Sequence, residues 1–159
     1  MSEFSHVNKD NQITMVDVSD KQNSLRVAVA QCMVVLPPNV LEAIQGDEIM
    51  APKGPVFQTA IIAGIQGAKK TSDLIPLCHP LPISGIKIKC DLEGNTVVIS
   101  CKVRTTGQTG VEMEALTGVN IAALTIYDMC KAMSHDIIIR ACQLISKTGG
   151  KKDFNREKS

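Results

Sequence analysis

The chain has 159 residues, a formal net charge of +1, and 44% hydrophobic but only 3% aromatic residues. This length predicts a single domain with an aliphatic core. The near-neutral charge argues against broad nucleic-acid binding, which needs a concentrated basic face, and the few aromatic residues argue against base stacking. There is no signal-peptide pattern and no uncharged apolar run of ~18 residues, so we expect a cytoplasmic protein that does not enter membranes.

The six cysteines do not include a C-x-x-C pair, so the sequence lacks the usual paired spacing of a zinc site. Most of them alternate with Ile and Val in strand-like runs. We therefore expect small, buried hydrophobic side chains in a reducing compartment rather than metal ligands.

The N-terminal half of the chain predicts one strand and two helices. Residues 1–14 are polar and unpatterned, which indicates a flexible arm. Residues 25–36 read LRVAVAQCMVVL, a strand pattern that two prolines end. The pattern favours a short helix over 39–45 and a longer one over 55–70, where apolar residues recur every three or four positions. Three prolines in seven residues then predict a stiff, extended loop within 71–82.

The C-terminal half predicts a hairpin, a long helix and a last strand. Alternating apolar residues indicate strands over 86–92 and 97–103, joined by a Gly-Asn turn. A long helix fits 111–133, and a strand fits 137–145. The remaining residues, 147–159, form a basic tail that contains glycine.

The predicted order of elements is β-α-β-β-α-β. This is the ferredoxin-like, split-βαβ pattern, in which helices pack on one face of an antiparallel sheet. We expect one α+β domain over residues 15–146, without internal repeats or a domain linker.

The long helix contains ALTGVNIAALTIY, thirteen residues without a charge. A helix that is apolar on nearly every side is buried all round or lies at a subunit interface. A domain of this size can hardly surround it, so we favour a homo-oligomer. The alternative is a crowded monomer core.

Two carboxylates on this helix are candidates for chemistry. Asp128 and Lys131 are three residues apart and so share one face, either as an exposed ion pair of little consequence or as an acid–base pair in a cleft. Glu114 and Asp128 are fourteen residues apart, about 21 Å along a helix axis. If both serve one substrate, either the helix starts later or a second subunit supplies one of them.

Three loops carry further candidates. Cys78 and His79 stand between prolines; a nucleophilic Cys–His pair is less favoured than His79 as a hydrogen-bond donor to a substrate, and a purely structural loop is the alternative. TTGQTG at 105–110 precedes the long helix, whose N-terminus attracts anions. KTGGKK at 147–152 is a basic segment that could fold over an anion or could simply be a solvated tail.

Four blocks of sequence go further than these patterns. They are MVDVS at 15–19, PLCHPLPI at 76–83, TGVEMEALTGV at 109–119 and AALTIYDMCKA at 122–132. In this order they resemble the cyclic pyranopterin monophosphate synthase family, also called molybdenum-cofactor biosynthesis protein C. The resemblance covers residues from about 13 to 154.

The resemblance implies a lyase of molybdenum cofactor (molybdopterin) biosynthesis with a ferredoxin-like catalytic domain. Its substrate would be a cyclised dihydro-GTP, and its products cyclic pyranopterin monophosphate and pyrophosphate. The resemblance implies no metal and no organic cofactor. It also implies a homohexamer, a trimer of dimers, with active sites between subunits.

Site residues carry over where the motifs match. Asp128, Lys131 and Lys53 take catalytic positions: we hypothesise that Asp128 is a general acid/base tuned by Lys131, and that Lys53 is a second proton donor or a phosphate ligand. The positions that match substrate-binding residues are Leu77, Cys78, His79, Glu112, Met113, Glu114, Lys147 and Lys151.

The sequence departs from the family pattern at two places. Ile61 stands where family members usually have Arg, and the tail reads KTGGKKD rather than KSGGKSG. These departures bear on phosphate affinity. The alternatives to an enzyme are a non-catalytic nucleotide-binding module on the same fold, a metal-dependent hydrolase that uses His79 and cysteine, and a structural scaffold.

Overall fold

The computed structural model describes residues 11–158 of the chain, so the first ten residues of the predicted arm lie outside the described part. One layer is a five-stranded antiparallel sheet with the strand order β5-β6-β1-β7-β8. Its strands are β1 (Ser24–Val35), β5 (Ile83–Glu93), β6 (Thr96–Gly107), β7 (Ile138–Thr148) and β8 (Phe154–Asn155).

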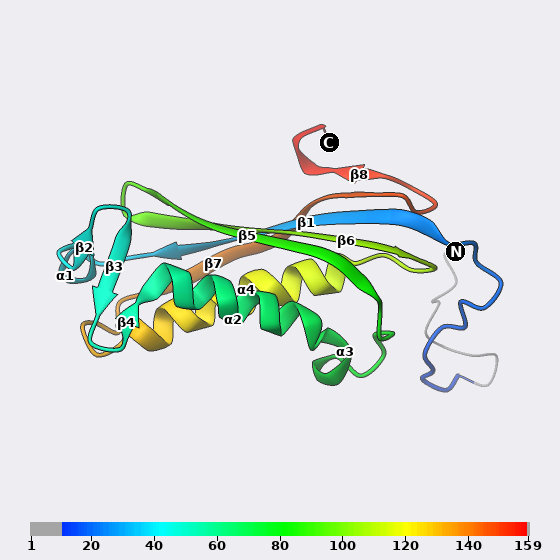
Figure 1. Ribbon diagram of the computed structural model, residues 1–159, viewed down its shortest axis with the longest axis horizontal. Helices are drawn as coiled ribbons and strands as arrows, with labels where there is room; N and C mark the ends of the chain where they lie inside the picture. The colour runs from blue at the N-terminus through cyan, green and yellow to red at the C-terminus, as the bar shows by residue number, and fades with distance from the viewer. Residues whose placement is uncertain (1–10, 159) are drawn as a thin grey trace.

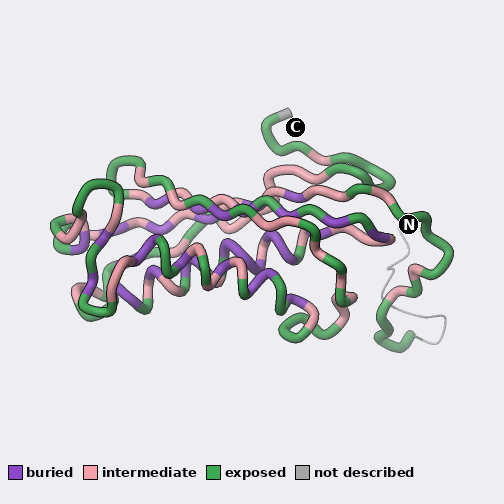
Figure 2. The backbone as a smooth tube through the Cα atoms, viewed as in Figure 1, coloured by how far each residue is buried: buried purple, intermediate pink, exposed green. Residues whose placement is uncertain are grey.

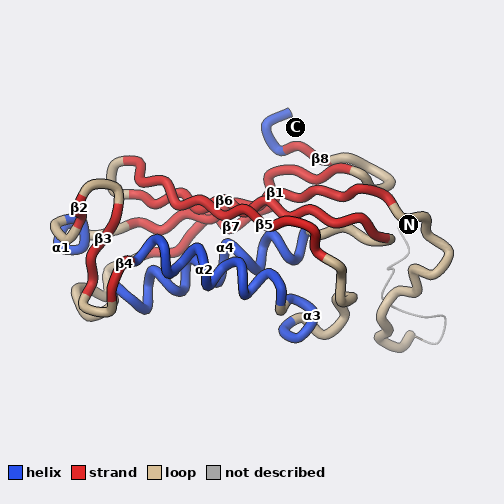
Figure 3. The backbone as a smooth tube through the Cα atoms, viewed as in Figure 1, coloured by secondary structure: helices blue, strands red, loops and turns tan. Residues whose placement is uncertain are grey.

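Two helices form the second layer and cover one face of this sheet (Figures 1 and 3). They are α2 (Val56–Lys69) and α4 (Glu112–Cys130). The order β1-α2-β5-β6-α4-β7 is the predicted β-α-β-β-α-β order, so the ferredoxin-like α+β fold is confirmed. No helix in the described part is long and apolar enough to cross a bilayer.

The core lies between the sheet and the two helices, where the buried residues gather (Figure 2). Strand β1 alternates: Ala28, Ala30, Cys32 and Val34 are almost fully buried, whereas the residues between them are partly exposed. Because successive side chains of a strand point to opposite faces, this alternation places the aliphatic side chains against the helices. The aliphatic core inferred from composition is the one observed.

Helices α2 and α4 pack closely because small residues stand where they cross. A Cβ added at Gly67 would lie 2.6 Å from Cγ1 and 2.9 Å from Cβ of Ile121. A Cβ at Gly64 would lie 2.8 Å from the carbonyl oxygen of Gly118. All three distances are shorter than van der Waals contact, so the approach of the two helices requires glycine at both positions.

We therefore expect Gly67→Ala to lower the free energy of unfolding by about 1–3 kcal/mol, the usual cost of overpacking. The helix propensity of Ala opposes this loss but is smaller. Gly85→Ala is the matched control, because a Cβ there meets nothing within 4 Å. Urea denaturation of both variants measures the difference; equal stability of the two variants would contradict the packing argument.

Several local predictions were wrong. The short helix expected over 39–45 is α1 (Pro38–Leu41), which ends earlier. The chain then forms a small antiparallel sheet that was not predicted, with strands β2 (Ile44–Gln45), β3 (Glu48–Ala51) and β4 (Gly54–Pro55). Strands this short carry too few residues to show a period of two. The loop within 71–82 is not wholly extended, because Thr71–Leu74 forms the one-turn helix α3.

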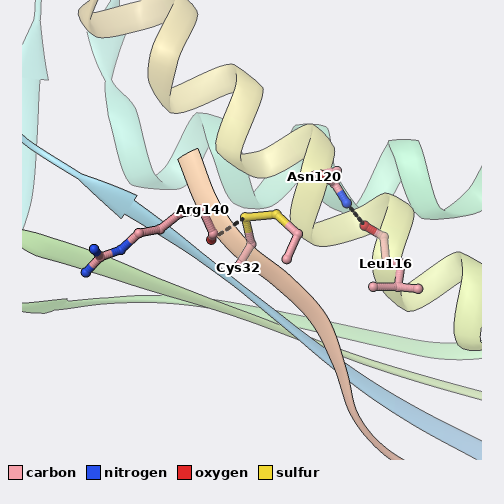
Figure 4. The surroundings of a disulfide bond; sticks show 5 residues. Cys32, Leu116, Asn120 and Arg140 are labelled. Atoms are coloured by element: carbon pink, nitrogen blue, oxygen red, sulfur yellow. Dashed lines mark hydrogen bonds between the residues drawn. A yellow bond between two sulfur atoms is a disulfide. The ribbon is translucent and has the colours of Figure 1, made fainter. Parts of the chain in front are cut away.

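The prediction for the cysteines also needs correction, because Cys32 of β1 and Cys142 of β7 form a disulfide (Figure 4). Residues 110 apart in the sequence give no signal of this pairing. The Cys32–Cys142 pair lies where the register between β1 and β7 is irregular, near Gln31–Met33. Cys101 and Cys130 are free and buried as expected, and burial raises the pKa of their thiols to about 12 and about 11.

Candidate active site

A cluster of three charged side chains lies where α4 ends. Lys53 stands in the turn between β3 and β4, and Asp128 and Lys131 lie at the C-terminal end of α4. The Lys53 Nζ atom is 2.8 Å from Asp128 Oδ2, and the Lys131 Nζ atom is 2.7 Å from Asp128 Oδ1. Each carboxylate oxygen therefore has its own ammonium partner.

The two lysines shift the titration of the carboxylate. Hydrogen bonds from Lys131 and then from Lys53 lower the pKa of Asp128 to about 2, and Asp128 in turn raises the pKa of Lys131. All three side chains are about half exposed, so water screens the pairs. At neutral pH Asp128 is an anion that can accept a proton, and the protons available for donation lie on the lysines.

The pH dependence follows from these directions. Because the pKa of Asp128 is lowered by folding, its contribution to stability is fully present above its ordinary pKa of 3.8 and is lost as the pH falls through about 2. We expect a carboxyl carbon NMR titration of Asp128 to have its midpoint near 2, and Lys131→Gln to move that midpoint toward 3.8. A wild-type midpoint at the ordinary value would contradict the pairing.

A cavity of about 350 Å³ lies at the other end of α4. Its wall combines the proline-rich loop, the start of α4 and the segment before β1. The substrate-binding residues predicted from the sequence that line it are Leu77, Cys78, His79, Glu112, Met113 and Glu114.

Hydrogen bonding and burial determine where the protons lie on two loop residues of this cavity, His79 and Cys78. The Nε2 atom of His79 lies 2.7 Å from the carbonyl oxygen of Val16. A carbonyl oxygen only accepts, so Nε2 carries a proton and Nδ1 faces away from this bond. Burial raises the pKa of Cys78, which keeps it a thiol, and His79 bonds to Val16. These contacts do not favour a Cys–His nucleophile.

Glu114 is the buried acid of the cavity, with 4% of its surface exposed. Burial raises its pKa, with a smaller contribution from the neighbouring charge of Glu112. A carboxyl group whose pKa is raised is protonated closer to neutral pH than an ordinary one. It can then donate a hydrogen bond to a ring carbonyl or hold a ring N–H as an acceptor.

A second cavity of about 290 Å³ adjoins the first, and both are lined by Lys21, Thr109, Gly110 and Glu112. Its wall is basic: the lysines and arginine that line it are Lys21, Arg26, Lys147, Lys151 and Lys152. Lys147 Nζ lies 3.0 Å from Glu112 Oε1, and Arg26 donates to the carbonyls of Gly107 and Gln108. The loop before α4 is thereby fixed beside a positively charged hollow that suits an anion.

The charged cluster and the cavities are separated along α4. Glu114 and Asp128 both belong to this one helix, which begins at Glu112. Fourteen residues of helix place them about 21 Å apart. Figure 1 shows the same separation: β4 lies at one end of the helical layer, and α3 and the N-terminal segment lie at the other. A later helix start, the first of the two explanations from sequence, is therefore excluded.

A family model described as the MoaC family matches residues 15–150 of the chain. The chain belongs to the MoaC family. A cyclic pyranopterin monophosphate synthase of Brevibacillus brevis is 50% identical over 156 residues, which cover 97% of this chain and 96% of that protein.

Two further relatives are longer. A molybdenum cofactor biosynthesis bifunctional protein of Synechocystis is 51% identical over 96% of this chain, which spans 46% of that protein. Molybdenum cofactor biosynthesis protein 1 of Dictyostelium discoideum is 48% identical over 94% of this chain, which spans 27% of that protein. The chain thus spans half or less of these two relatives.

Several residues that the sequence did not single out also line these cavities. Val16, Val18 and Lys21 line the first cavity, and Arg26 lines the second beside Lys152 of the expected basic segment. The sequence block MVDVS at 15–19 contains Val16 and Val18, but it gave no physical reason to place them in a pocket. Arg26 offered no signal, because it stands in an ordinary strand pattern.

The two departures from the family pattern, at Ile61 and in the C-terminal tail, can also be placed in the structure. Ile61, which stands where the resemblance leads us to expect an Arg, packs against the hydrophobic core as a partly buried residue of α2. Strand β7 continues through Thr148, so Lys147 is a strand residue paired with Phe154 of β8. Within residues 11–158, no three His, Cys, Asp or Glu side chains gather as metal ligands would.

Proposed function

We propose that this protein is a cyclic pyranopterin monophosphate synthase, a lyase of molybdenum cofactor biosynthesis. It converts a cyclised dihydro-GTP to cyclic pyranopterin monophosphate and releases pyrophosphate. The observation that carries the proposal is the cluster of Lys53, Asp128 and Lys131, which unites the three positions that match the family's catalytic residues. The names of relatives that match this chain over nearly their whole length support the same activity.

The two cavities divide the substrate between them. The first offers Glu114, His79 and apolar side chains, which suit the polar edge and flat faces of a guanine-derived ring. The second offers lysines and an arginine, which suit the triphosphate. Lys147 and Lys151 bind phosphate oxygens in this assignment, and Leu77, Cys78 and Met113 contact the ring.

The charged cluster supplies the proton transfers. A ring must open and be rebuilt, and a cyclic phosphate must form while pyrophosphate leaves. The Asp128 carboxylate accepts a proton, and the ammonium groups of Lys53 and Lys131 donate one or neutralise charge that develops on the phosphate. The lowered pKa of Asp128 fixes the starting state: the free enzyme presents an ionised carboxylate between two ammonium groups.

We infer further that the enzyme is a homohexamer, a trimer of dimers, with each active site between subunits. About 21 Å of helix separates the cluster from the cavities of the same chain, which is farther than one substrate of this size reaches. Apolar side chains are also exposed on the outer face of the helical layer: Ile62 is 68% exposed and Leu124 is 57% exposed. A second copy that covers this face would bury them and bring its cluster to the cavity. We also propose a cytoplasmic location.

Turnover tests the proposal. Purified protein is mixed anaerobically with the cyclised dihydro-GTP, and both products are assayed. We expect cyclic pyranopterin monophosphate and pyrophosphate to form in equal amounts without added metal or organic cofactor. Binding of the intermediate without either product would favour the alternative, a non-catalytic nucleotide-binding module.

A further inference from the structure

Helix α2 lacks a capping side chain of its own. Its N-cap residue is Pro55, which makes no side-chain hydrogen bond to the helix, and its first turn contains no acidic residue. The first N–H groups of a helix have no carbonyl partner within the helix and need an acceptor from elsewhere.

Glu48, on β3, provides this acceptor. Its Oε1 atom accepts hydrogen bonds from the backbone N–H of Phe57 at 2.7 Å and of Ile49 at 2.8 Å, and its Oε2 atom accepts one from Gln58 at 3.1 Å. The carboxylate also lies at the positive end of the helix dipole. A single side chain therefore ties the backbone of β3 to the first turn of α2.

The two elements that Glu48 joins flank the turn that carries Lys53. Strand β3 ends at Ala51, which pairs with Gly54, so Pro52 and Lys53 form a two-residue turn before α2 begins. Gly54 has a φ of +114°, a conformation that L side chains rarely adopt. The backbone of this turn is thus fixed from both sides.

The Lys53 side chain has no comparable support. It is 55% exposed, and among the described residues its polar contacts are with Asp128: the carboxylate at 2.8 Å and the backbone carbonyl at 3.4 Å. A long, exposed side chain reaches a target reproducibly only when its backbone is held in place. The position of the Lys53 ammonium group therefore depends on the anchoring of the turn.

We propose that Glu48 is a positioning residue for Lys53. Its carboxylate caps α2 from β3 and thereby holds the turn in the position from which the Lys53 ammonium group reaches Asp128. This role rests on the proposed synthase function, because it matters only where that ammonium group takes part in the reaction. Glu48 itself touches neither cavity and is not a catalytic residue.

Kinetics of Glu48→Ala and Glu48→Gln provide the first test. We expect Glu48→Ala to lower kcat by about 10- to 100-fold, the cost of a small misplacement of a reacting group, with KM nearly unchanged. Glu48→Gln keeps one acceptor oxygen and should recover most of this loss. Glu42→Gln is the control. Glu42 lies at the end of α1, is exposed, and its side chain makes no hydrogen bond or ion pair among the described residues. A residue that only stabilised the fold would lower Tm and leave kcat, measured well below Tm, unchanged.

The Lys53→Gln background shows whether Glu48 acts through Lys53. Two residues that act through one contact do not have additive effects. We expect Glu48→Ala to cost little further activity in this background. An equal loss of kcat with and without Lys53 would overturn the proposal.

Chemical labelling tests the same point without turnover. In Glu48→Ala, a brief treatment with an amine-acetylating reagent should modify Lys53 faster than in the wild type, relative to the exposed Lys70 as internal reference. If Lys53 reacts at the wild-type rate, the proposal fails. If the wild type makes no product, the synthase function fails instead, and labelling alone decides whether Glu48 positions Lys53.

Discussion

Asp128→Asn is expected to lower turnover by about 10²- to 10⁴-fold, the range found when a positioned acid or base is removed. Asparagine keeps the size of the side chain but cannot accept a proton, and it loses the charge that holds Lys53 and Lys131 at 2.8 and 2.7 Å. Because Asp128 is half exposed and water screens its ion pairs, its contribution to stability is small and the fold should persist without it. Steady-state kinetics of product formation measure the effect.

The matched control is Asp136→Asn, which changes an exposed aspartate just beyond α4. Its turnover and melting temperature should match those of the wild type. Asp128→Asn should keep the subunit assembly and a melting temperature only slightly lower, while it loses activity. Turnover near the wild-type rate would remove Asp128 from the mechanism and leave the two lysines without a common function.

Lys147→Glu is expected to act on substrate binding rather than on the chemical step. The substitution removes a proposed phosphate ligand and places a second carboxylate beside Glu112, whose Oε1 atom lies 3.0 Å from Lys147 Nζ in the wild type. A hydrogen bond between charged groups is worth about 1.5–3 kcal/mol, so we expect KM for the triphosphate substrate to rise by about 10- to 100-fold or more.

Lys70→Glu, at the exposed end of α2, serves as the charge-matched control and should leave KM unchanged. The KM of the wild type should also rise with ionic strength, because salt screens attraction between exposed lysines and phosphates. If Lys147→Glu and the control behaved alike, the basic cavity would not be the triphosphate site.

Much of the fold could be predicted from local patterns. The apolar run LRVAVAQCMVVL, ended by two prolines, identified β1, and the uncharged run in α4 identified a helix buried on most sides. These signals extend over twelve or more residues, so packing reinforces them. The small sheet of β2, β3 and β4 has strands of two to four residues, too short for any period.

The site was predictable in its parts but not in its arrangement. The sequence placed Asp128 and Lys131 on one helical face, and their contact agrees with that. It offered no physical reason for Lys53 to meet them, since the two positions are 75 residues apart and come together through the turn after β3. Resemblance to the family, rather than spacing, brought Lys53 into the list of candidates.

The contribution of Glu48 shows the same limit. In the sequence it is one of several acidic residues near a glycine, without a capping motif before α2. Its bonds to Phe57 and Gln58 depend on how β3 folds back beside the helix. Long-range side-chain-to-backbone bonds of this kind leave no mark in a local pattern.

We propose that one active site takes its charged cluster from one subunit and its cavities from another. Co-expression of Asp128→Asn and Lys147→Glu subunits with different tags tests this sharing, when the purified mixed oligomers are assayed for cyclic pyranopterin monophosphate. Each variant alone should be nearly inactive at low substrate concentration. If halves of the site come from different subunits and mix at random, about a quarter of the sites are intact, and activity should return to about a quarter of the wild-type value. Mixed oligomers as inactive as either parent would contradict a shared site and would require both halves to act within one chain.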